Sequence, residues 1–529
     1  DADVPPSESI APKTARMLDR AIIVLLAIAV GYFAFDKFVL SPHREAVLVA
    51  AATREAAARA KPADRGNSIA VLPLANASGD ANQLFFSDGL SENLIDALSK
   101  LEGLRVIGRT SSFRFRDSKE DARSIGAKLG VAYLLAGSVQ RADDQVRIRA
   151  EVVRTSDGSA IWTDSFDRPF RDLFALQDEL TRAIAGVLKA KLLSPGARTD
   201  DRPPSGSVEA YSAFLREVFY ADRGEDGDMR RAIAEMTRAT QLDPGYASAW
   251  AALSRNWTTL AALGLSGDEA QRAYAEARKA GDVALGLAPD LGDAYVARGW
   301  LLENAELDWR GATIAYRRGL ELSPDNLQTM FSMASMLALQ GQLNEAIALS
   351  RQALDNDPMS PNWWNWYSAY LSAVGRLDEA EAAIRQSIAL RPQGSSAWAQ
   401  LAIIELQRGD AKAALDAAEK EPEGVWHEIA LAMALQVGKD RAAADAALAK
   451  LIADHGDVAA YQVAQVQALR NDADATFEWL QRAHETRDPG VGNTLIDPLV
   501  MRYRNDPRLA AFCKTVGLPP PTESQTKGL

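Results

Sequence analysis

Hydrophobic and polar positions divide the chain into three stretches with different periods. An unbroken apolar run covers residues 21–35, and three further apolar residues follow at 38–40. Between residues 68 and 193, some segments alternate apolar with polar residues and others repeat them at helical spacing, which is typical of mixed strands and helices. From residue 208 onward, small residues and prolines recur at an interval close to 34, which is typical of stacked helix pairs.

The first stretch predicts a single transmembrane helix within residues 17–40. As a helix, Ala21–Leu40 is about 30 Å long, which matches the hydrocarbon core of a membrane. The alternatives are a cleaved signal peptide and a buried core helix. A signal peptide needs a small-residue cleavage site directly after the run, but Phe38-Val39-Leu40 stands there. Basic residues flank the run almost equally, so only the short leading segment favours a cytoplasmic amino terminus.

Four further segments predict ends and linkers. We expect residues 1–16 to be a disordered cytoplasmic segment and residues 519–529 to be a disordered tail. Residues 41–66 begin with an Ala, Arg and Glu-rich run and end with proline and glycine, so we expect a helical stalk and linker. Residues 194–207 are rich in Pro, Gly, Ser and Asp and predict a linker between two domains.

Residues 67–193 predict a small α/β domain. In the segment 145–154, apolar residues alternate with polar ones, so one face of a strand is buried and the other faces water. The expected strands are 68–74, 104–107, 132–140, 145–154 and 159–166, and the expected helices are 88–101, 122–129 and 170–193.

Residues 208–518 predict an all-α solenoid of tetratricopeptide repeats (TPR) with a carboxy-terminal cap. Pro324, Pro358 and Pro392 are 34 residues apart, and small residues such as Ala346 stand at fixed positions before them. Small residues let the second helix of a pair nest against the first, and proline ends that helix. We expect five clear repeats and about three degenerate ones. The fold class is therefore multidomain: a single transmembrane helix, a small α/β domain and a TPR solenoid.

A stack of this kind binds partners along its concave groove, which positions 2, 5, 9 and 12 of each first helix line. The run 363–367 has more aromatic residues than core packing requires. Exposed Trp and Asn suit contact with a peptide, and the alternative is that Trp363 and Trp366 pack against neighbouring repeats. The expected partner-binding groove comprises Gln328, Phe331, Ser335, Asn362, Trp363, Asn365, Trp366 and Ser372.

Composition limits the chemistry further. The net charge of −12 argues against general binding of nucleic acid, which needs a basic face. The single cysteine, Cys513, excludes an intrachain disulfide. The four histidines are scattered, and we find no phosphate-binding loop or zinc signature. We therefore predict no catalytic residue, no cofactor and no metal ligand, and we expect the protein not to be an enzyme.

Two clusters in the α/β stretch nevertheless resemble binding sites. Arg105, Arg109, Arg114 and Arg116 alternate with two phenylalanines, as in sites for single-stranded nucleic acid. The alternative, favoured because acidic residues follow at once, is a solvated strand or loop. Asp88, Glu92 and Asp96 share one helix face and suggest cation binding or acid–base chemistry. The favoured alternative is that Asp88 caps the helix and the other two face solvent.

Three segments resemble the TolB-like amino-terminal domain of bacterial envelope and signalling proteins. They are SIAVLPLANASGDANQLFFSDGLSENLIDALSKLEGLRVIGRTSSF (68–113), AYLLAGSVQR (132–141) and IWTDSFDR (161–168). The tail 477–518 is similar to the usual ending of TolB-like proteins with repeats. This resemblance implies an inner-membrane protein with a cytoplasmic amino terminus and periplasmic main domains.

The leading functional hypothesis is therefore a membrane-anchored periplasmic scaffold. It is expected to bind protein or peptide partners through the TPR groove and the TolB-like domain, as a homo-oligomer or as a subunit of a membrane complex. The alternative is a sensor whose cytoplasmic output domain, a winged helix or an adenylate cyclase in related proteins, is absent from this sequence.

Overall fold

The computed structural model describes residues 67–142, 144–188, 191–192, 202–223, 227–265 and 267–521. They belong to one compact unit that starts at Arg65. The segments expected at 1–16, 17–40 and 41–66 lie outside the described residues, as do 194–201 and 522–529.

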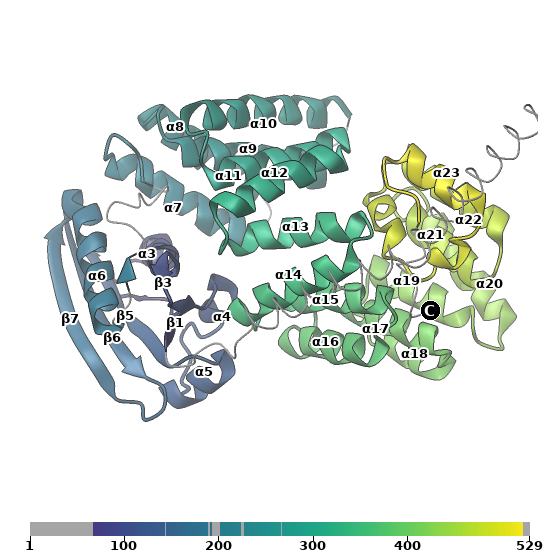
Figure 1. The fold of residues 1–529 in the computed structure, drawn as a ribbon, viewed down its shortest axis with the longest axis horizontal. Coiled ribbons are helices and arrows are strands. Elements are labelled where there is room, and N and C mark those ends of the chain that lie inside the picture. Colours follow the sequence, from purple (N-terminus) through teal and green to yellow (C-terminus); the bar gives the residue numbers. More distant parts are fainter. Residues whose placement is uncertain are drawn as a thin grey trace, which may run out of the picture. The chain divides into compact units, whose positions relative to one another are not determined.

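The first domain is built on a sheet with the strand order β4-β1-β5-β6-β7 (Figure 1). The first three strands are parallel, whereas β5, β6 and β7 form an antiparallel meander. Their bounds are β1 (Ser68–Val71), β2 (Ala75–Asn76, which also pairs with β5), β4 (Arg105–Val106), β5 (Tyr133–Ala142), β6 (Gln145–Arg154) and β7 (Ala160–Pro169). A separate pair joins β3 (Leu101–Glu102) and β8 (Lys191–Leu192).

Helices cover both faces of this sheet. One face packs against α3 (Leu84–Ser99) and α6 (Leu173–Leu188), with η3 (Ala81–Gln83) and η4 (Phe170–Asp172) before them. The other face packs against α5 (Ala122–Leu129) and the turn that follows α4 (Arg109–Phe113). Neighbouring residues on β5 enter different cores, Leu135 the first and Leu134 the second, because successive side chains of a strand point to opposite faces. The prediction of a small α/β domain is confirmed.

Eight antiparallel helix pairs follow in the described residues, and they form the repeat array (Figure 1). In the third pair the first helix, α11, ends in the π-helical turn η5 (Leu302–Glu306). The pairs are α7 (Val208–Arg223) with α8 (Asp228–Leu242), α9 (Ala247–Gly264) with α10 (Gly267–Leu287), α11 (Gly292–Leu301) with α12 (Trp309–Leu322), α13 (Leu327–Leu339) with α14 (Leu343–Asn356), α15 (Pro361–Ala373) with α16 (Leu377–Leu390), α17 (Ala397–Arg408) with α18 (Ala411–Ala418), α19 (Val425–Leu435) with α20 (Arg441–His455), and α21 (Ala460–Leu469) with α22 (Ala473–Glu485).

Small residues hold each pair together, as the spacing predicted. Ala346 on α14 and Ala380 on α16 are both fully buried. Gly341 and Gly375 end the first helices of the same pairs with φ of 74° and 76°, a left-handed conformation that favours glycine. These features confirm the prediction of a tetratricopeptide-like array.

The carboxy-terminal segment comprises η6 (Pro489–Leu495), η7 (Met501–Tyr503) and α23 (Pro507–Thr515). It packs on the eighth pair, where Gly490 lies against the ring of Tyr461. It also contacts the third pair, because the indole Nε1 of Trp309 donates to the carbonyl oxygen of Val516 over 2.8 Å. The segment therefore covers the end of the array and also joins it to helices about 200 residues earlier in the chain.

The expected fold class is wrong in one component, the single transmembrane helix. Among the residues that the structure describes, no helix has both the length and the apolar character needed to cross a membrane. The longest of them, α10, has 21 residues but carries acidic and basic side chains along its length. The fold class supported here is a small α/β domain followed by a mostly helical repeat array.

Candidate functional site

The residues expected to form the groove lie on two first helices, α13 and α15, but they differ in exposure. Gln328 and Asn362 are exposed at the starts of these helices. Phe331, Ser335, Asn365 and Trp366 are partly exposed. Trp363 and Ser372 are buried, with 5% and 1% of their surface exposed.

Trp363 and Ser372 serve the packing of neighbouring repeats. The ring of Trp363 packs edge-to-face on Phe331 at a centroid distance of 5.1 Å, which joins α15 to α13. The hydroxyl of Ser372 accepts a hydrogen bond from Gln407 Nε2 at 2.5 Å, which joins α15 to α17. Neither side chain is available to a partner in this structure, so neither remains a candidate for partner binding.

Asn365 and Trp366 are adjacent on α15, and both are partly exposed. The Oδ1 atom of Asn365 is buried and receives no hydrogen bond among the described residues. A buried acceptor without a donor costs about 1–3 kcal/mol. The ring of Trp366 lies 6.1 Å from the ring of Tyr370 and stays partly exposed.

A polar cluster next to these residues was not expected from the sequence. It contains Glu303 from η5, Tyr316 from α12 and Tyr370 from α15. The hydroxyl of Tyr316 donates to Glu303 Oε2 over 2.7 Å. The hydroxyl of Tyr370 is hydrogen-bonded to Ser335, and the charge of Glu303 acts on Tyr370. Glu303 therefore lies near the expected groove residues of α13 and α15.

Burial raises the pKa of Glu303 to about 7, although the hydrogen bond from Tyr316 lowers it. Burial, with the charge of Glu303 as the second cause, raises the pKa of Tyr316 well above its ordinary value. At neutral pH, the Glu303 carboxyl is therefore close to half protonated. The sequence held a signal for this residue, since Glu303 is eight residues after Tyr295, just as Ser372 is eight residues after Trp364.

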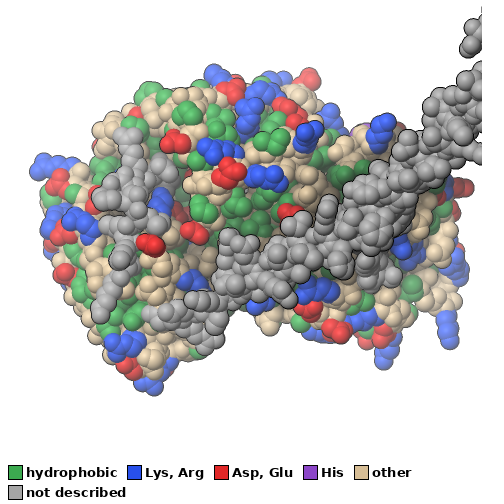
Figure 2. All heavy atoms as spheres, in the orientation of Figure 1, with side chains coloured by type: hydrophobic (Ala, Val, Ile, Leu, Met, Phe, Trp, Pro, Cys, Tyr) green, Lys and Arg blue, Asp and Glu red, His purple; other side chains and the backbone are tan. Residues whose placement is uncertain are grey.

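The four arginines that suggested nucleic-acid binding make contacts within the protein. Arg105 donates to the carbonyl oxygens of Gly130 and Asp355, the latter over 2.8 Å, and Arg114 donates to that of Leu390 over 2.7 Å. Arg109 and Arg116 pair with carboxylates of α3 at 3.2 and 2.7 Å. On the visible face of the molecule, basic and acidic side chains are also interspersed (Figure 2). These arginines therefore hold the α/β domain together and attach it to the repeats.

The acidic trio of α3 does not lie as expected. Asp88 is a buried residue inside the helix, paired with Arg116, and not its cap. Glu92 pairs with Arg109. Burial, the charge of Glu92 and that of Asp293 on α11 raise the pKa of Asp96 to about 7 against the opposing effect of Lys100. The acidic face of α3 thus meets arginines and the repeat array, while Glu92 and Asp96 stay partly exposed to solvent. Around the described residues, no group of acidic, histidine or cysteine side chains is placed to hold a metal ion.

The α/β domain is fixed to the repeats at the loop between α14 and α15. Asp357 Oδ1 accepts hydrogen bonds from the backbone N–H and the hydroxyl of Ser111, at 2.8 and 2.5 Å. The Ser111 hydroxyl in turn accepts from the N–H of Met359 at 2.8 Å, and Gly108 N donates to the carbonyl oxygen of Asn356 at 2.8 Å. The segment 108–111 is therefore a docking element, which the sequence did not reveal.

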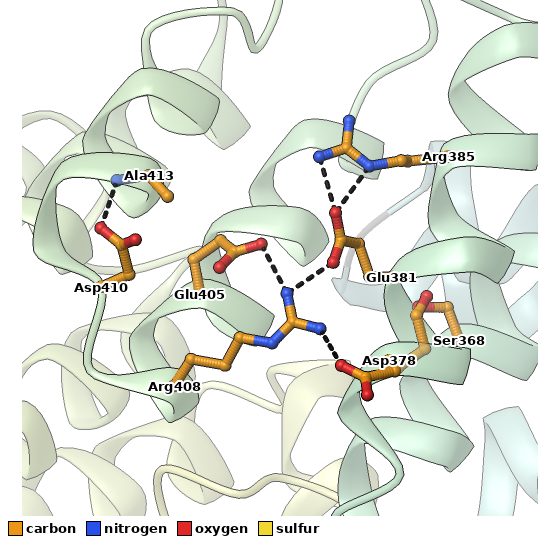
Figure 3. Close-up of polar contacts among 9 residues, drawn as sticks. Ser368, Asp378, Glu381, Arg385, Glu405, Arg408, Asp410 and Ala413 are labelled. Carbon is orange, nitrogen blue, oxygen red and sulfur yellow. Dashed lines mark hydrogen bonds and ion pairs between the residues drawn. The ribbon is translucent and has the colours of Figure 1, made fainter.

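A second charged cluster lies between α16 and α17 (Figure 3). Arg408 contacts Glu381, Asp378 and Glu405 at 2.5, 2.7 and 3.1 Å. Glu381 also accepts from Arg385 at 2.7 Å. Every charged group in this cluster has a partner, so the cluster links two repeats and leaves no free charge for a ligand.

Comparison with known proteins identifies relatives of parts of the chain. Residues 65–183 match the family model described as the HilA/YgeH-like transcriptional regulator, second domain. A curated relative, the putative adenylate cyclase 3 of Rhizobium meliloti (strain 1021), is 40% identical over 192 residues, which are 35% of this chain and 32% of the relative. The match thus spans about a third of the relative's length. The matching family model has a different description from the TolB-like domain, so the TolB-like assignment stays a prediction.

Solved structures similar to this chain are repeat proteins. PilW, a widely conserved type IV pilus biogenesis factor, is 18% identical with a TM-score of 0.33, covering 39% of this chain and 91% of PilW. YrrB, a TPR protein with an unusual peptide-binding site, is 18% identical with a TM-score of 0.26, covering 40% of this chain and 98% of YrrB. A thermophilic TPR protein of Thermus thermophilus is 18% identical with a TM-score of 0.30, covering 39% of this chain and 99% of that protein. At these scores, the assignment of the fold rests on the helix pairs themselves.

Proposed function

We propose that this protein is an interaction scaffold whose first helices α11, α13 and α15 bind a peptide segment of a protein partner. The observation that carries the proposal is the pair Asn365 and Trp366. Both residues are partly exposed, and they are adjacent on one first helix, α15. Asn bonds the backbone of an extended peptide, and Trp supplies buried area at interaction surfaces. Of the other two tryptophans of the run, Trp363 is buried, and Trp364 Nε1 donates to the carbonyl oxygen of Pro358 over 2.8 Å.

The test is selection of peptides from a random dodecapeptide library by the purified full chain. We expect enrichment with the wild type and none with the double variant Asn365→Ala and Trp366→Ala, whose melting temperature stays close to the wild-type value. The matched control replaces two exposed residues of the second helices, Gln352→Ala and Gln386→Ala, and should enrich the same peptides. Equal enrichment by both double variants contradicts the proposal.

A second function is favoured by the match to a protein named as an adenylate cyclase. In this role the same residues are the recognition part of a signalling protein, and the catalytic step belongs to another domain. The gene beyond both ends of this sequence provides the test. A cyclase or DNA-binding domain in the same reading frame supports the signalling role, and its absence supports the scaffold.

We also propose that the main domains lie in the periplasm and that the protein self-associates. Fusion of alkaline phosphatase to the carboxy terminus gives active enzyme only if this end reaches the periplasm. Sedimentation of the purified chain measures its mass in solution. A cytoplasmic fusion and a monomeric mass contradict the two proposals separately.

A further inference from the structure

The α/β domain contacts the repeats at two places, and the first of these is apolar. Val208, Tyr211 and Leu215 of α7 are buried in the same core as the residues of α3, α6 and the sheet. The ring of Phe174 lies 5.0 Å from the ring of Tyr211, whose hydroxyl accepts a hydrogen bond from Gln177 Nε2 over 2.8 Å. Separating α7 from the domain would expose this apolar surface to water, so α7 moves with the α/β domain.

The second place is mostly polar and lies between residues 105–114 and the fourth and fifth pairs. Besides the hydrogen bonds of Ser111 to the loop before α15, the guanidinium groups of Arg105 and Arg114 donate to backbone carbonyl oxygens of α14 and α16. The partly buried side chain of Met359 adds an apolar contact. Breaking such hydrogen bonds costs less than exposing an apolar core, because water replaces the lost partners. We call this second contact the latch.

The repeats between these two contacts are the least strongly packed part of the described array. The buried residues of α9, α10 and the start of α11 fall into three small apolar clusters, and alanine is the most frequent residue in each. From Val296 onward, one large cluster with Leu, Met, Trp and Tyr side chains reaches the carboxy-terminal segment. Alanine removes less apolar area from water than these residues, so it stabilises helix packing less. After the π-helical turn η5, Leu307 has a φ of 54°, which residues other than glycine rarely adopt. Bending is therefore expected between α8 and α12.

We propose that the latch opens without unfolding of either domain: its hydrogen bonds break, and the α/β domain moves with α7 and α8 away from the fourth and fifth pairs as the second and third pairs bend. This device goes beyond the proposed function and does not depend on it. Its state is passed to α15, because the N–H of the cap residue Ser360 donates to the carbonyl oxygen of Asp357 over 3.3 Å. Opening therefore releases the start of the helix that carries Asn365 and Trp366, which couples the α/β domain to the candidate binding surface.

Hydrogen exchange of backbone amides, followed by NMR, tests the opening in the full chain. The reporters are the N–H groups of Gly108 and Met359, which donate across the latch to Asn356 O and Ser111 Oγ, both at 2.8 Å. In the wild type, we expect the reporters to exchange at least about a hundred times faster than amides in the middle of β5. Their exchange should also depend less on urea, because opening exposes less surface than unfolding does. Equal rates with equal urea dependence overturn the proposal, since the latch then opens only when the protein unfolds.

Variants separate opening of the latch from a general loss of stability. Asp357→Ala leaves the acceptors of both reporters in place but removes the acceptor for two donors of Ser111. Exchange of the reporters should therefore become about thirty times faster. The control Asp410→Ala removes a comparable acceptor, which caps α18 by accepting from Ala413 N over 2.9 Å and has no part in the latch. In this control the reporters should exchange as in the wild type. Faster exchange in both variants, or in neither, overturns the proposal.

Distances between nitroxide labels, measured by electron–electron double resonance, test the movement itself. The one cysteine of the sequence is buried, so the labels attach to cysteines introduced at exposed positions: Ala127→Cys on α5, Ala234→Cys on α8 and Gln386→Cys on α16. When Arg114→Ala and Asp357→Ala are combined, the labels on α5 and α16 should show a second, longer distance. The distance between the labels on α5 and α8 should keep its wild-type value, because these helices move together. A single unchanged distance between α5 and α16, or equal changes in both label pairs, overturns the proposal.

Discussion

Two aromatic-rich segments look alike in the sequence and make different contacts in the structure. Residues 105–116 interleave arginines with phenylalanines, and residues 362–372 interleave Trp and Tyr with Asn and Ser. In the first segment each guanidinium contacts a carboxylate or a carbonyl oxygen of the protein. In the second, Trp363 packs on Phe331, whereas Asn365 and Trp366 stay partly exposed. The comparison teaches that contacts with distant residues, and not composition, decide which side chains of such a segment remain accessible.

The largest expected effect comes from Trp363, an aromatic residue of the second segment that is buried in the core. Trp363→Ala should lower the free energy of unfolding by about 4 kcal/mol, because it removes a buried ring and leaves a cavity. Trp366→Ala should cost much less, since that ring is partly exposed. Urea unfolding of the two variants measures the difference. Equal losses would break the comparison, because both tryptophans would then be core residues.

The sequence predicted the parts of the fold that depend on period. The alternation in 145–154 gave a strand, and the small residues at Ala346 and Ala380 marked helix crossings. These features depend on near neighbours in the chain, so one sequence is enough to show them. The membrane helix expected at 17–40 has no counterpart among the described residues.

The candidate site was predicted only in part, because contacts over long distances in the chain decide which side chains are free. Arg105 and Asp355 are 250 residues apart, and Ser111 and Asp357 are 246 apart. No local sequence pattern predicts such pairs. Likewise Trp363 and Trp366 have the same residue type and differ only in the side of α15 on which they lie. Glu303 was not predicted, because its repeat spans 35 residues and departs from the period of 34 that marks the groove positions.

The second prediction concerns the docking of the first segment on the repeats. Asp357→Ala removes the acceptor for two donors of Ser111 and should cost about 2 kcal/mol, since both donors are buried. Asp357→Asn keeps an acceptor oxygen and should cost less. Burial raises the pKa of Asp357, so the neutral amide also avoids the cost of a buried charge. Unfolding in urea, with the exposed Asp355→Ala as control, gives the values. Similar stability of the Ala and Asn variants contradicts the role of this acceptor.

The third prediction concerns Glu303 on η5 and uses pH as the variable. The pKa of Glu303 is raised from 4.5 to about 7 in the folded protein. Its contribution to stability is therefore complete below the unfolded value and is lost as the pH rises through about 7. Between about pH 5 and pH 8 we expect the wild type to lose about 2 kcal/mol more than Glu303→Gln. Asp96, whose pKa is raised to a similar value, contributes equally to both proteins. Parallel pH profiles of the two proteins would show that Glu303 is not buried as described.

The smallest effect is expected where partly exposed charges are already paired with each other. Arg408→Ala removes two contacts between α17 and α16 and one within α17. We expect a loss of about 1 kcal/mol, since water and salt screen the pairs. Unfolding in about 1 M NaCl should reduce this loss by about half. Arg408→Lys keeps the charge but not the planar fork, so it should recover only part of the stability. A loss that is the same at low and high salt would mean that the stem of Arg408 stabilises the repeats by packing. The charged cluster would then differ from residues 105–116, where hydrogen bonds of the guanidinium groups join the two domains.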